Sequence, residues 1–348
     1  MTKKILVTGA AGLLGANFSR HLLDKGYEVV GVDNLSGGYI EYAPKHSKFQ
    51  FMKNNSGDKE IVSLVESGDI SHIYHFAAMP AAGLSPFIRT NNYENNIVET
   101  SKLINASING DIKKFIFASS MEVYGGHSRL PFREQDILEC VPETPYGISK
   151  RMIELDLESA WNYHKLDYAI IRPHNVHGIY QNIWDGYRNV IGIFIRKALA
   201  GEPLTVDGDG NQLRAYSDVR YYMKPLECLM NNHSREYRDS SSLPIWNIGA
   251  DMPNSLLDVV ESIRQVCVQS NLSVPEVVHL EPRQEVKNAW CDHSLAKQEL
   301  GFKDETNLYT LISDMMMWAL EQPIKEVRTV NFEVKKNLYS YWKEPTPK

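Results

Sequence analysis

The chain has 348 residues, of which 43% are hydrophobic and 23% are charged, and its formal net charge is -6. This length suffices for one large or two modest domains with a sizeable core, and the composition excludes disordered and fibrous proteins. The negative charge argues against a nucleic-acid-binding protein, because phosphate backbones need a basic surface.

The cysteines and the first residues indicate the cellular compartment. Cys140, Cys228, Cys267 and Cys291 lie far apart and show no spacing typical of disulfide frameworks or zinc ligands. A strand-like run begins almost at once, which leaves no room for a signal peptide, and no apolar stretch approaches a membrane span in length. We therefore expect a soluble, cytoplasmic protein that has no metal and binds neither membrane nor nucleic acid.

Strand-like and helix-like segments alternate through the first half. Strands are predicted over Lys4–Thr8, Glu28–Val32, Phe49–Met52, His72–Phe76 and Lys114–Ala118. Helices are predicted over Leu13–Lys25, Lys59–Glu66 and Tyr93–Ser107. Strands that are apolar throughout are covered on both faces, and the intervening helices supply that cover. Residues 1–171 are therefore predicted to form a Rossmann-type, doubly wound α/β domain with a parallel sheet.

Beyond residue 171 the pattern is less regular. Helices are predicted at about Asn189–Ala200, Ser255–Val268 and Leu308–Leu320, whereas the tail from Asn331 receives no element. We predict that residues 172–348 form mainly a smaller, mixed substrate-binding domain, interwoven with the first and sharing a cleft with it.

A glycine-rich segment follows the first predicted strand and opens the first predicted helix, as a dinucleotide-binding fingerprint requires. Gly9 would make the tight turn, Gly12 would let the backbone approach a pyrophosphate, and Gly15 would let the helix pack closely on the sheet. The phosphates would then lie on free N–H groups at the helix N-terminus, so Leu13 and Leu14 are also expected cofactor residues.

Asp33 ends the second predicted strand, about 20 residues beyond the glycines, where a carboxylate can accept hydrogen bonds from both ribose hydroxyls. Its charge would repel the 2'-phosphate of NADP. The following residues, beginning with Asn34, offer no arginine to offset that repulsion. The sequence therefore predicts NAD as the cofactor, with Asp33 and Asn34 among its ligands.

Tyr146, Lys150 and Ser120 are the candidate catalytic residues. Tyr146 and Lys150 are four residues apart, so on a helix they share a face. A phenol is a poor base at its usual pKa of about 10, but a neighbouring ammonium and a positive nicotinamide ring would favour the phenolate. Ser120 lies just past the fifth predicted strand, where an open parallel sheet binds its ligands, and can hold the substrate oxygen that loses its proton.

These residues resemble the extended short-chain dehydrogenase/reductases that act on nucleotide sugars, including UDP-galactose 4-epimerases and sugar dehydratases. The resemblance covers nearly the whole chain and is carried, in the family's order, by Thr8–Gly15, His75–Ala78, Ser119–Gly125, Tyr146–Lys150 and Arg172–Val176.

The resemblance also implies ligand-binding roles. Ala77 and Ala78 would line the cofactor, Pro173 would lie by the nicotinamide ribose, and Asn175 would reach the substrate diphosphate. Two segments, Gly208–Arg214 and Glu281–Arg283, look like the family's diphosphate-gripping elements. The resemblance gives Arg214 and Arg283 as phosphate ligands, which suits the planar guanidinium, and places Arg188 and Met121 at the substrate.

The resemblance leaves the exact reaction open. We favour a 4-epimerase that works through a transient 4-keto sugar. The alternatives are a 4,6- or 5,6-dehydratase, a 3,5-epimerase and a decarboxylase, because family members that act at carbon 5 place an acid/base group at the position of Glu122. Met121, the residue before it, cannot donate the proton that a dehydratase would need. A dehydrogenase that releases reduced cofactor and a non-catalytic NAD and nucleotide-sugar binder are further alternatives. His177, where a tyrosine is common, is either a proton relay or a packed histidine.

The expected partners are a UDP- or GDP-sugar and a second copy of the chain. By the resemblance, the helices around Tyr93–Ser107 and Pro145–Tyr163 would form the shared bundle of a homodimer.

Overall fold

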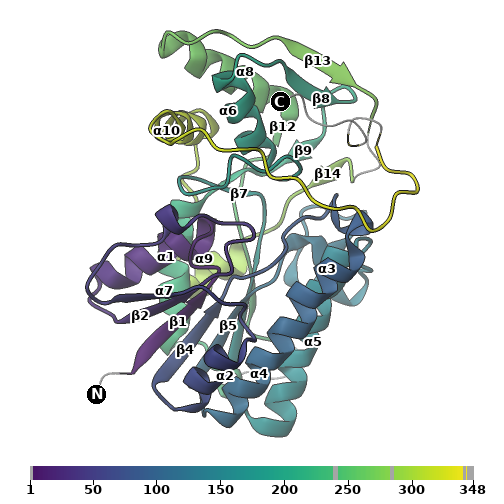
Figure 1. Ribbon diagram of the computed structural model, residues 1–348. Helices are drawn as coiled ribbons and strands as arrows, with labels where there is room; N and C mark the ends of the chain where they lie inside the picture. Colours follow the sequence, from purple (N-terminus) through teal and green to yellow (C-terminus); the bar gives the residue numbers. More distant parts are fainter. Residues whose placement is uncertain (1–2, 238–241, 283–285, 340–341, 343–348) are drawn as a thin grey trace.

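A parallel sheet forms the centre of the computed structural model, which describes residues 3–237, 242–282, 286–339 and 342. In the described part of the chain this sheet has seven strands in the order β11-β6-β5-β4-β1-β2-β3. The strands are β1 (Lys4–Thr8), β2 (Val29–Val32), β3 (Phe49–Met52), β4 (Ile70–His75), β5 (Lys114–Ala118), β6 (Tyr168–Pro173) and β11 (Ile245–Ile248). All paired neighbours run parallel (Figure 1).

Helices cover both faces of this sheet, which explains why its central strands are apolar along their whole length. On one face pack α1 (Leu13–Asp24), α7 (Met223–Asn231) and α9 (Ser294–Leu300). On the other face pack α2 (Lys59–Glu66), α4 (Glu99–Asn109) and α5 (Pro145–His164). Each face has its own buried apolar cluster, around Phe18 and Trp246 on the first and Phe115 and Leu157 on the second.

The helix predicted over Tyr93–Ser107 is longer and is built in three pieces. It consists of α3 (Arg89–Tyr93), a π-helical turn η3 (Glu94–Val98) and α4. A π turn inside a helix often marks a functional site, since the extra residue shifts which side chains face inward. Here the shift brings Asn96 inward, where its side chain accepts from the Met79 N–H at 2.7 Å and donates to the Ser149 hydroxyl at 3.2 Å.

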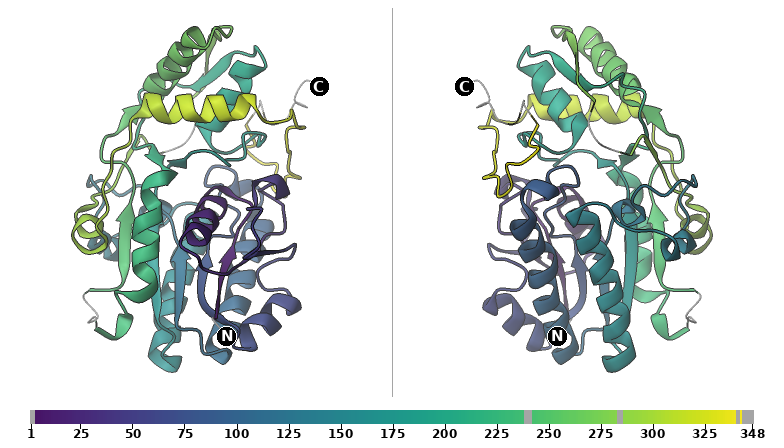
Figure 2. Two further views of the ribbon diagram at one scale, coloured as in Figure 1. Left: turned by 90° about the vertical axis from the view of Figure 1, so that its left-hand side faces the viewer. Right: turned by 90° about the vertical axis from the view of Figure 1, so that its right-hand side faces the viewer.

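A second lobe lies beyond the carboxyl edge of the sheet and has its own core. Its helices α6 (Val190–Leu199), α8 (Leu256–Gln269) and α10 (Leu308–Leu320) pack on one another and on β8 (Leu204–Asp207) (Figure 2). The second lobe also contains two smaller sheets. One pairs β8 with β13 (Val277–Leu280), and the other pairs β9 (Leu213–Arg214) with β12 (Asn254–Ser255) and β14 (Asn288–Ala289). A short pair, β7 (Val176–His177) with β10 (Ser217–Asp218), lies between the lobes.

The predicted fold class is confirmed, and β1, β3, β5, α2 and α10 have the predicted bounds. The main sheet nevertheless crosses the predicted division at residue 171. Its strand β11 and the covering helices α7 and α9 all come from later in the chain. The chain therefore returns to the main sheet and its covering helices twice after entering the second lobe, and the division at residue 171 stays a prediction.

Candidate active site

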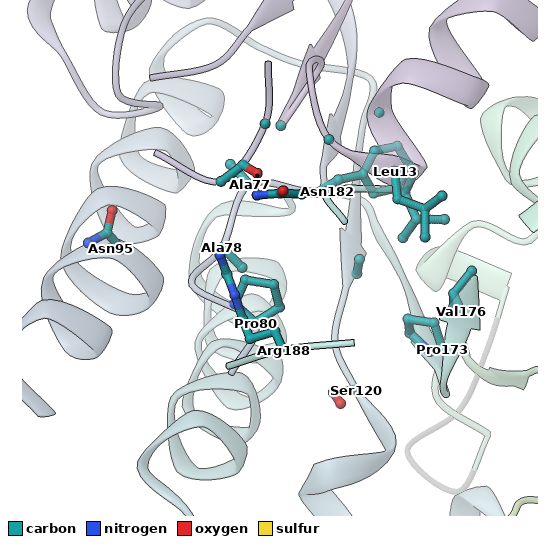
Figure 3. Close-up of a pocket in the computed structure, with 18 of the residues that line it drawn as sticks. Leu13, Ala77, Ala78, Pro80, Asn95, Ser120, Pro173, Val176, Asn182 and Arg188 are labelled. Carbon is teal, nitrogen blue, oxygen red and sulfur yellow. Dashed lines mark hydrogen bonds between the residues drawn. The ribbon is translucent and has the colours of Figure 1, made fainter. Parts of the chain in front are cut away.

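The main cavity lies at the carboxyl ends of the parallel strands and has a volume of about 350 Å³. The residues that directly follow β1, β2, β4, β5 and β6 all contribute to its walls. Figure 3 shows Leu13, Ala77 and Ser120 reaching it from the first lobe and Asn182 and Arg188 from the segment after β7. An open α/β sheet binds its ligands in this crevice.

The glycine-rich turn forms one wall and fits a dinucleotide. Gly9 has a φ of 68°, and a Cβ there would lie 2.9 Å from the Ala77 nitrogen. A Cβ on Gly15 would lie 2.1 Å from the Gly9 oxygen, so only glycine allows this approach of α1 to the turn. The N-cap of α1, Gly12, brings no side chain to the first N–H groups of the helix. Those N–H groups can therefore donate to the oxygens of the cofactor's pyrophosphate.

Asp33 lines the cavity at the end of β2. One carboxylate oxygen accepts from the Ala11 N–H at 3.0 Å and the other from the Leu35 N–H at 2.7 Å. Burial raises the pKa of Asp33, and these two backbone hydrogen bonds oppose the rise. Each carboxylate oxygen keeps a second lone pair for a ribose hydroxyl. Asn34, Ala77, Ala78 and Pro173, the other residues predicted for the cofactor, line the same cavity.

The start of α5 presents the catalytic pair. Thr144 caps this helix by accepting from the Gly147 N–H at 3.1 Å, and Pro145 occupies its first turn. Tyr146 and Lys150 follow one turn apart, are both buried and both line the cavity. The predicted shared face is therefore present. Their separation is 5.8 Å, measured from the Lys150 Nζ to the centre of the Tyr146 ring.

Charged neighbours and burial set the acidity of Tyr146. Burial raises the pKa of this phenol, hydrogen bonding with the Ser120 hydroxyl lowers it, the Glu122 carboxylate raises it and the Arg188 guanidinium lowers it. Lys150, the cation that the motif predicts beside the phenol, donates from its ammonium to the Ala118 carbonyl at 2.7 Å. Arg188 is thus a second cation that acts on Tyr146, and the motif Tyr146–Lys150 gives no sign of it.

Lys150 is itself strongly perturbed. Burial lowers its pKa to about 7, opposed by the nearby charge of Glu154. Glu154 pairs with Arg172 through two hydrogen bonds of 2.8 Å, and it also accepts from the Ser119 hydroxyl at 2.6 Å. Both partners of this ion pair are fully buried. The pair therefore ties β5, α5 and β6 together directly beneath the catalytic side chains.

The predicted substrate residues divide into two groups. Met121, Asn175 and Arg188 line the main cavity together with Ser120 and with Glu122, which was predicted as a catalytic residue. Arg214 is not among the lining residues, and its guanidinium donates to the carbonyls of Leu213, Val286 and Lys287. That engagement follows from the pairing of β9 with β14, which no motif in the sequence announces. Arg283 lies outside the described residues.

His177 is a packed histidine in this structure. It is buried, its Nδ1 lies 3.1 Å from the Gln181 Oε1, and it is not among the residues that line the cavity. Burial lowers the pKa of His177 to about 4. A neutral imidazole in this position favours the structural role over a proton relay.

Several residues that line the cavity are not indicated by any motif in the sequence. Asp185 accepts from the N–H groups of Tyr187 and Arg188 and pairs with the Arg188 side chain, with an Nε–Oδ2 distance of 2.6 Å. Asn182 donates to the Gly37 carbonyl at 2.9 Å. The only signal available was the polar composition of residues 181–189, which is equally typical of an exposed loop. Asn95 and Glu99 reach the cavity from η3 and α4.

The described residues hold no group of three or more His, Cys, Asp or Glu side chains able to bind a metal ion. Within the same residues, no helix combines the length and apolar character needed to cross a lipid bilayer.

The chain is similar to known enzymes along almost its whole length. It is 27% identical over 349 residues to a UDP-glucose 4-epimerase of Caenorhabditis elegans, which spans 92% of this chain and 98% of that protein. A UDP-glucose 4-epimerase of Yersinia pestis is 28% identical, with coverages of 92% and 98%.

Solved structures agree with these relatives. A UDP-glucose 4-epimerase of Thermotoga maritima, solved with UDP-glucose, superposes with a TM-score of 0.82 at 27% identity and covers 91% of this chain and 98% of its own. A UDP-glucuronic acid 4-epimerase of Bacillus cereus, solved with UDP-glucuronic acid and NAD, gives a TM-score of 0.79 at 26% identity, with coverages of 90% and 98%.

The family model for the NAD dependent epimerase/dehydratase family matches residues 5–249, a range that includes the glycine-rich turn, Asp33, Ser120, Tyr146 and Lys150. This chain belongs to the NAD dependent epimerase/dehydratase family and is an NAD-dependent enzyme.

Proposed function

We propose that this enzyme interconverts the carbon-4 epimers of a UDP-sugar through a transient 4-keto sugar. The observation that carries the proposal is the pairing of the Ser120 and Tyr146 hydroxyls beside a cavity that also contains the glycine-rich turn and Asp33. UDP is the favoured nucleotide because the relatives described above act on UDP-sugars by name.

The side chains have separate tasks in this reaction. NAD, when bound, supplies a reversible hydride acceptor for carbon 4. Ser120 holds the carbon-4 oxygen, and Tyr146 takes its proton and later returns it. Burial raises the pKa of Tyr146, so the phenolate that accepts the sugar proton forms only if positive charge lies near the phenol. Among the described residues that line the cavity, Lys150 and Arg188 are the lysine and the arginine that can supply this positive charge.

We also propose binding roles for the remaining lining residues. Asn175 and Arg188 would hold the substrate diphosphate, because both line the cavity and can donate hydrogen bonds to phosphate oxygens. Met121 would contact the sugar beside Ser120. Arg214 stays a weaker candidate, since its guanidinium already donates to three backbone carbonyls.

Glu122 supports a second candidate function, a reaction at carbon 5. Its carboxylate lines the cavity and acts electrostatically on Tyr146, so it lies close to the reacting sugar. A carbon-5 hydrogen next to a 4-keto group is acidic, and Glu122 could remove it. A dehydratase also needs an acid for the leaving hydroxyl, and Met121 offers none. We therefore rank the 4-epimerase first.

Incubation of the holoenzyme with UDP-glucose, UDP-galactose, UDP-N-acetylglucosamine and UDP-glucuronic acid in deuterated water, followed by NMR, tests this assignment. We expect inversion at carbon 4 of one of these sugars with no deuterium at carbon 5. Glu122→Gln should leave this inversion largely intact. Deuterium at carbon 5, a lost water or lost carbon dioxide, each abolished by Glu122→Gln, would replace the 4-epimerase with the second candidate.

We further propose that the enzyme is a homodimer and that α4 and α5 form its interface. Met152 and Leu155 on α5 are about half exposed, at 47% and 56%, and Tyr163 near its end is 82% exposed. Apolar side chains gathered on one helix are typical of such interfaces. Light scattering should give a dimer for the wild type and a monomer for Leu155→Glu, and a wild-type monomer would refute the proposal.

A further inference from the structure

A segment after α10 connects the two lobes. Residues 325–334, which we call the strap, leave the second lobe, cross the molecule between the lobes and reach the start of α3 (Figure 1, the yellow trace; Figure 2). None of the motifs that identify the enzyme includes it, and it lies beyond the match to the family model.

Arg328 in the strap binds the loop that follows Asp33. Its guanidinium donates to the carbonyls of Leu35, Ser36 and Gly38 at 3.1, 2.8 and 3.0 Å. The remaining carbonyl of this loop, on Gly37, accepts from Asn182. All four consecutive carbonyls of residues 35–38 therefore accept hydrogen bonds from side chains that lie far away in the sequence. Guanidinium suits this task because its five N–H donors have a fixed geometry.

The bound loop is part of the cofactor wall. Leu35 adopts a φ of 63°, which a non-glycine residue rarely does, and its N–H donates to the Asp33 carboxylate. Gly38 lies so close to the glycine-rich turn that a Cβ on it would be 2.2 Å from the Ala11 oxygen. The conformation that Arg328 stabilises is thus the one that orients Asp33 and closes the loop against the turn.

The strap is anchored on both sides of Arg328. The Arg328 N–H donates to the Trp184 carbonyl at 2.8 Å, in the segment that also carries Asp185 and Arg188. Farther on, the Glu333 carboxylate accepts from the N–H groups of Thr90 and Asn91 at 2.7 and 2.9 Å, at the start of α3. The strap therefore touches the loop after Asp33, the Arg188 segment and the helix start at once.

A second cavity of about 310 Å³ lies beneath the strap, walled by strap residues 326–330. It shares Ser36, Asp185 and Arg188 with the main cavity. The strap is thus the outer wall of a chamber that adjoins the cofactor wall. A cofactor that left along this side would have to displace Arg328 from the loop.

We propose that the strap retains NAD, with Arg328 as the positioning residue that acts through the loop of residues 35–38. NAD dissociates only when Arg328 releases the loop carbonyls, so the strap controls how long the cofactor stays bound. This inference rests on the NAD dependence of the family and not on the identity of the sugar or the reaction at carbon 4.

The test measures cofactor release directly. Wild-type and variant holoenzymes are loaded with isotope-labelled NAD, diluted into excess unlabelled NAD, and sampled by rapid gel filtration. Arg328→Ala should release the label about tenfold faster or more, because several hydrogen bonds from a charged donor are lost. Arg328→Lys should restore part of the retention. Lys336→Ala, which removes an exposed charge near the strap, is the matched control and should release NAD at the wild-type rate.

Thermal unfolding of the NAD-free proteins separates retention from stability. The proposal expects similar melting temperatures for wild type and Arg328→Ala, and wild-type release by a folded Arg328→Ala protein overturns it. If Arg328→Ala does not fold, Arg328→Lys decides: release about threefold faster than wild type supports the proposal, since an ammonium lacks the guanidinium fork, and unchanged release overturns it. Because label release needs no sugar, failure of the 4-epimerase proposal leaves this result unaffected.

Discussion

At the Tyr146 end of the cavity the supporting contacts are local and buried, whereas at the Asp33 end they are remote and more exposed. Beneath Tyr146, the ion pair of Glu154 and Arg172 joins residues 18 positions apart, and neither side chain is exposed. Beside Asp33, the Arg328 guanidinium reaches the Ser36 carbonyl across 292 positions, through hydrogen bonds that are exposed or only partly buried.

This difference suggests two kinds of support in one site. A buried ion pair cannot be opened without leaving an unpaired charge in the interior, so it fixes the catalytic side chains permanently. Hydrogen bonds between a guanidinium and accessible carbonyls can exchange with water at a smaller net cost than opening a buried ion pair. The Tyr146 end is therefore built for rigid chemistry and the Asp33 end for reversible closure. Four substitutions, from the largest expected effect to the smallest, test this contrast.

Tyr146→Phe should reduce turnover by at least about a thousandfold, because it removes the group that exchanges the proton. NAD retention, measured by labelled-NAD release, should stay at the wild-type value. Joint loss of turnover and NAD would contradict the separation of the two ends. Substantial residual turnover would remove Tyr146 from its proposed role.

Glu154→Gln should lower the free energy of unfolding by roughly 3 kcal/mol, because the Arg172 charge stays buried without its partner. The matched control is Glu158→Gln, on the same helix, where Glu158 pairs with Arg235 but is 25% exposed. We expect a loss of about 1 kcal/mol there. Urea denaturation of the NAD-free proteins measures both, and equal losses would show that burial of the first pair has no special weight.

Lys150→Met should stabilise the NAD-free protein at pH 6 by about 1 kcal/mol, while abolishing turnover. Burial lowers the pKa of Lys150 to about 7, well below that of an unfolded lysine. The unfolded chain thus binds more protons between about pH 7 and 10, so wild-type stability rises through that window, and the full cost of the buried charge is present below it.

The gain from Lys150→Met should accordingly vanish towards pH 10. Urea titrations at pH 6 and 9.5 measure it, with Lys336→Met as the exposed control. A variant that is less stable than wild type at pH 6 would mean that the hydrogen bond to the Ala118 carbonyl outweighs the cost of burying the charge.

Asn182→Ala should weaken NAD binding about threefold, because only the Gly37 carbonyl loses its partner and water can replace it. Calorimetric titration of the NAD-free protein measures the change, and the melting temperature should hardly move. A loss of more than about a hundredfold in NAD affinity would show that the Asp33 end is as rigid as the Tyr146 end, which would contradict the contrast between them.

The same contrast explains what the sequence could predict. The glycine-rich turn, Asp33, Tyr146 and Lys150 are recognisable because their chemistry needs particular residue types at short, fixed spacings. Arg328 binds carbonyl groups, which every residue carries, so its partners leave no mark on the sequence. Membership of β11 in the main sheet and the engagement of Arg214 with β14 are likewise decided by long-range pairing. Motifs therefore indicate the reacting residues, whereas the residues that position them are identified only from tertiary contacts.

The long sequence separation between the loop and the strap also has a consequence for synthesis. The loop of residues 35–38 leaves the ribosome with the first strands, and Arg328 follows 292 positions after Ser36. At about 5–20 residues per second, roughly 15–60 s pass before the loop can be closed. A nascent first lobe that already binds NAD would hold it loosely during this interval. Under our proposal for the strap, secure loading of the cofactor is therefore a late event in the biogenesis of the enzyme, set by the time that translation takes.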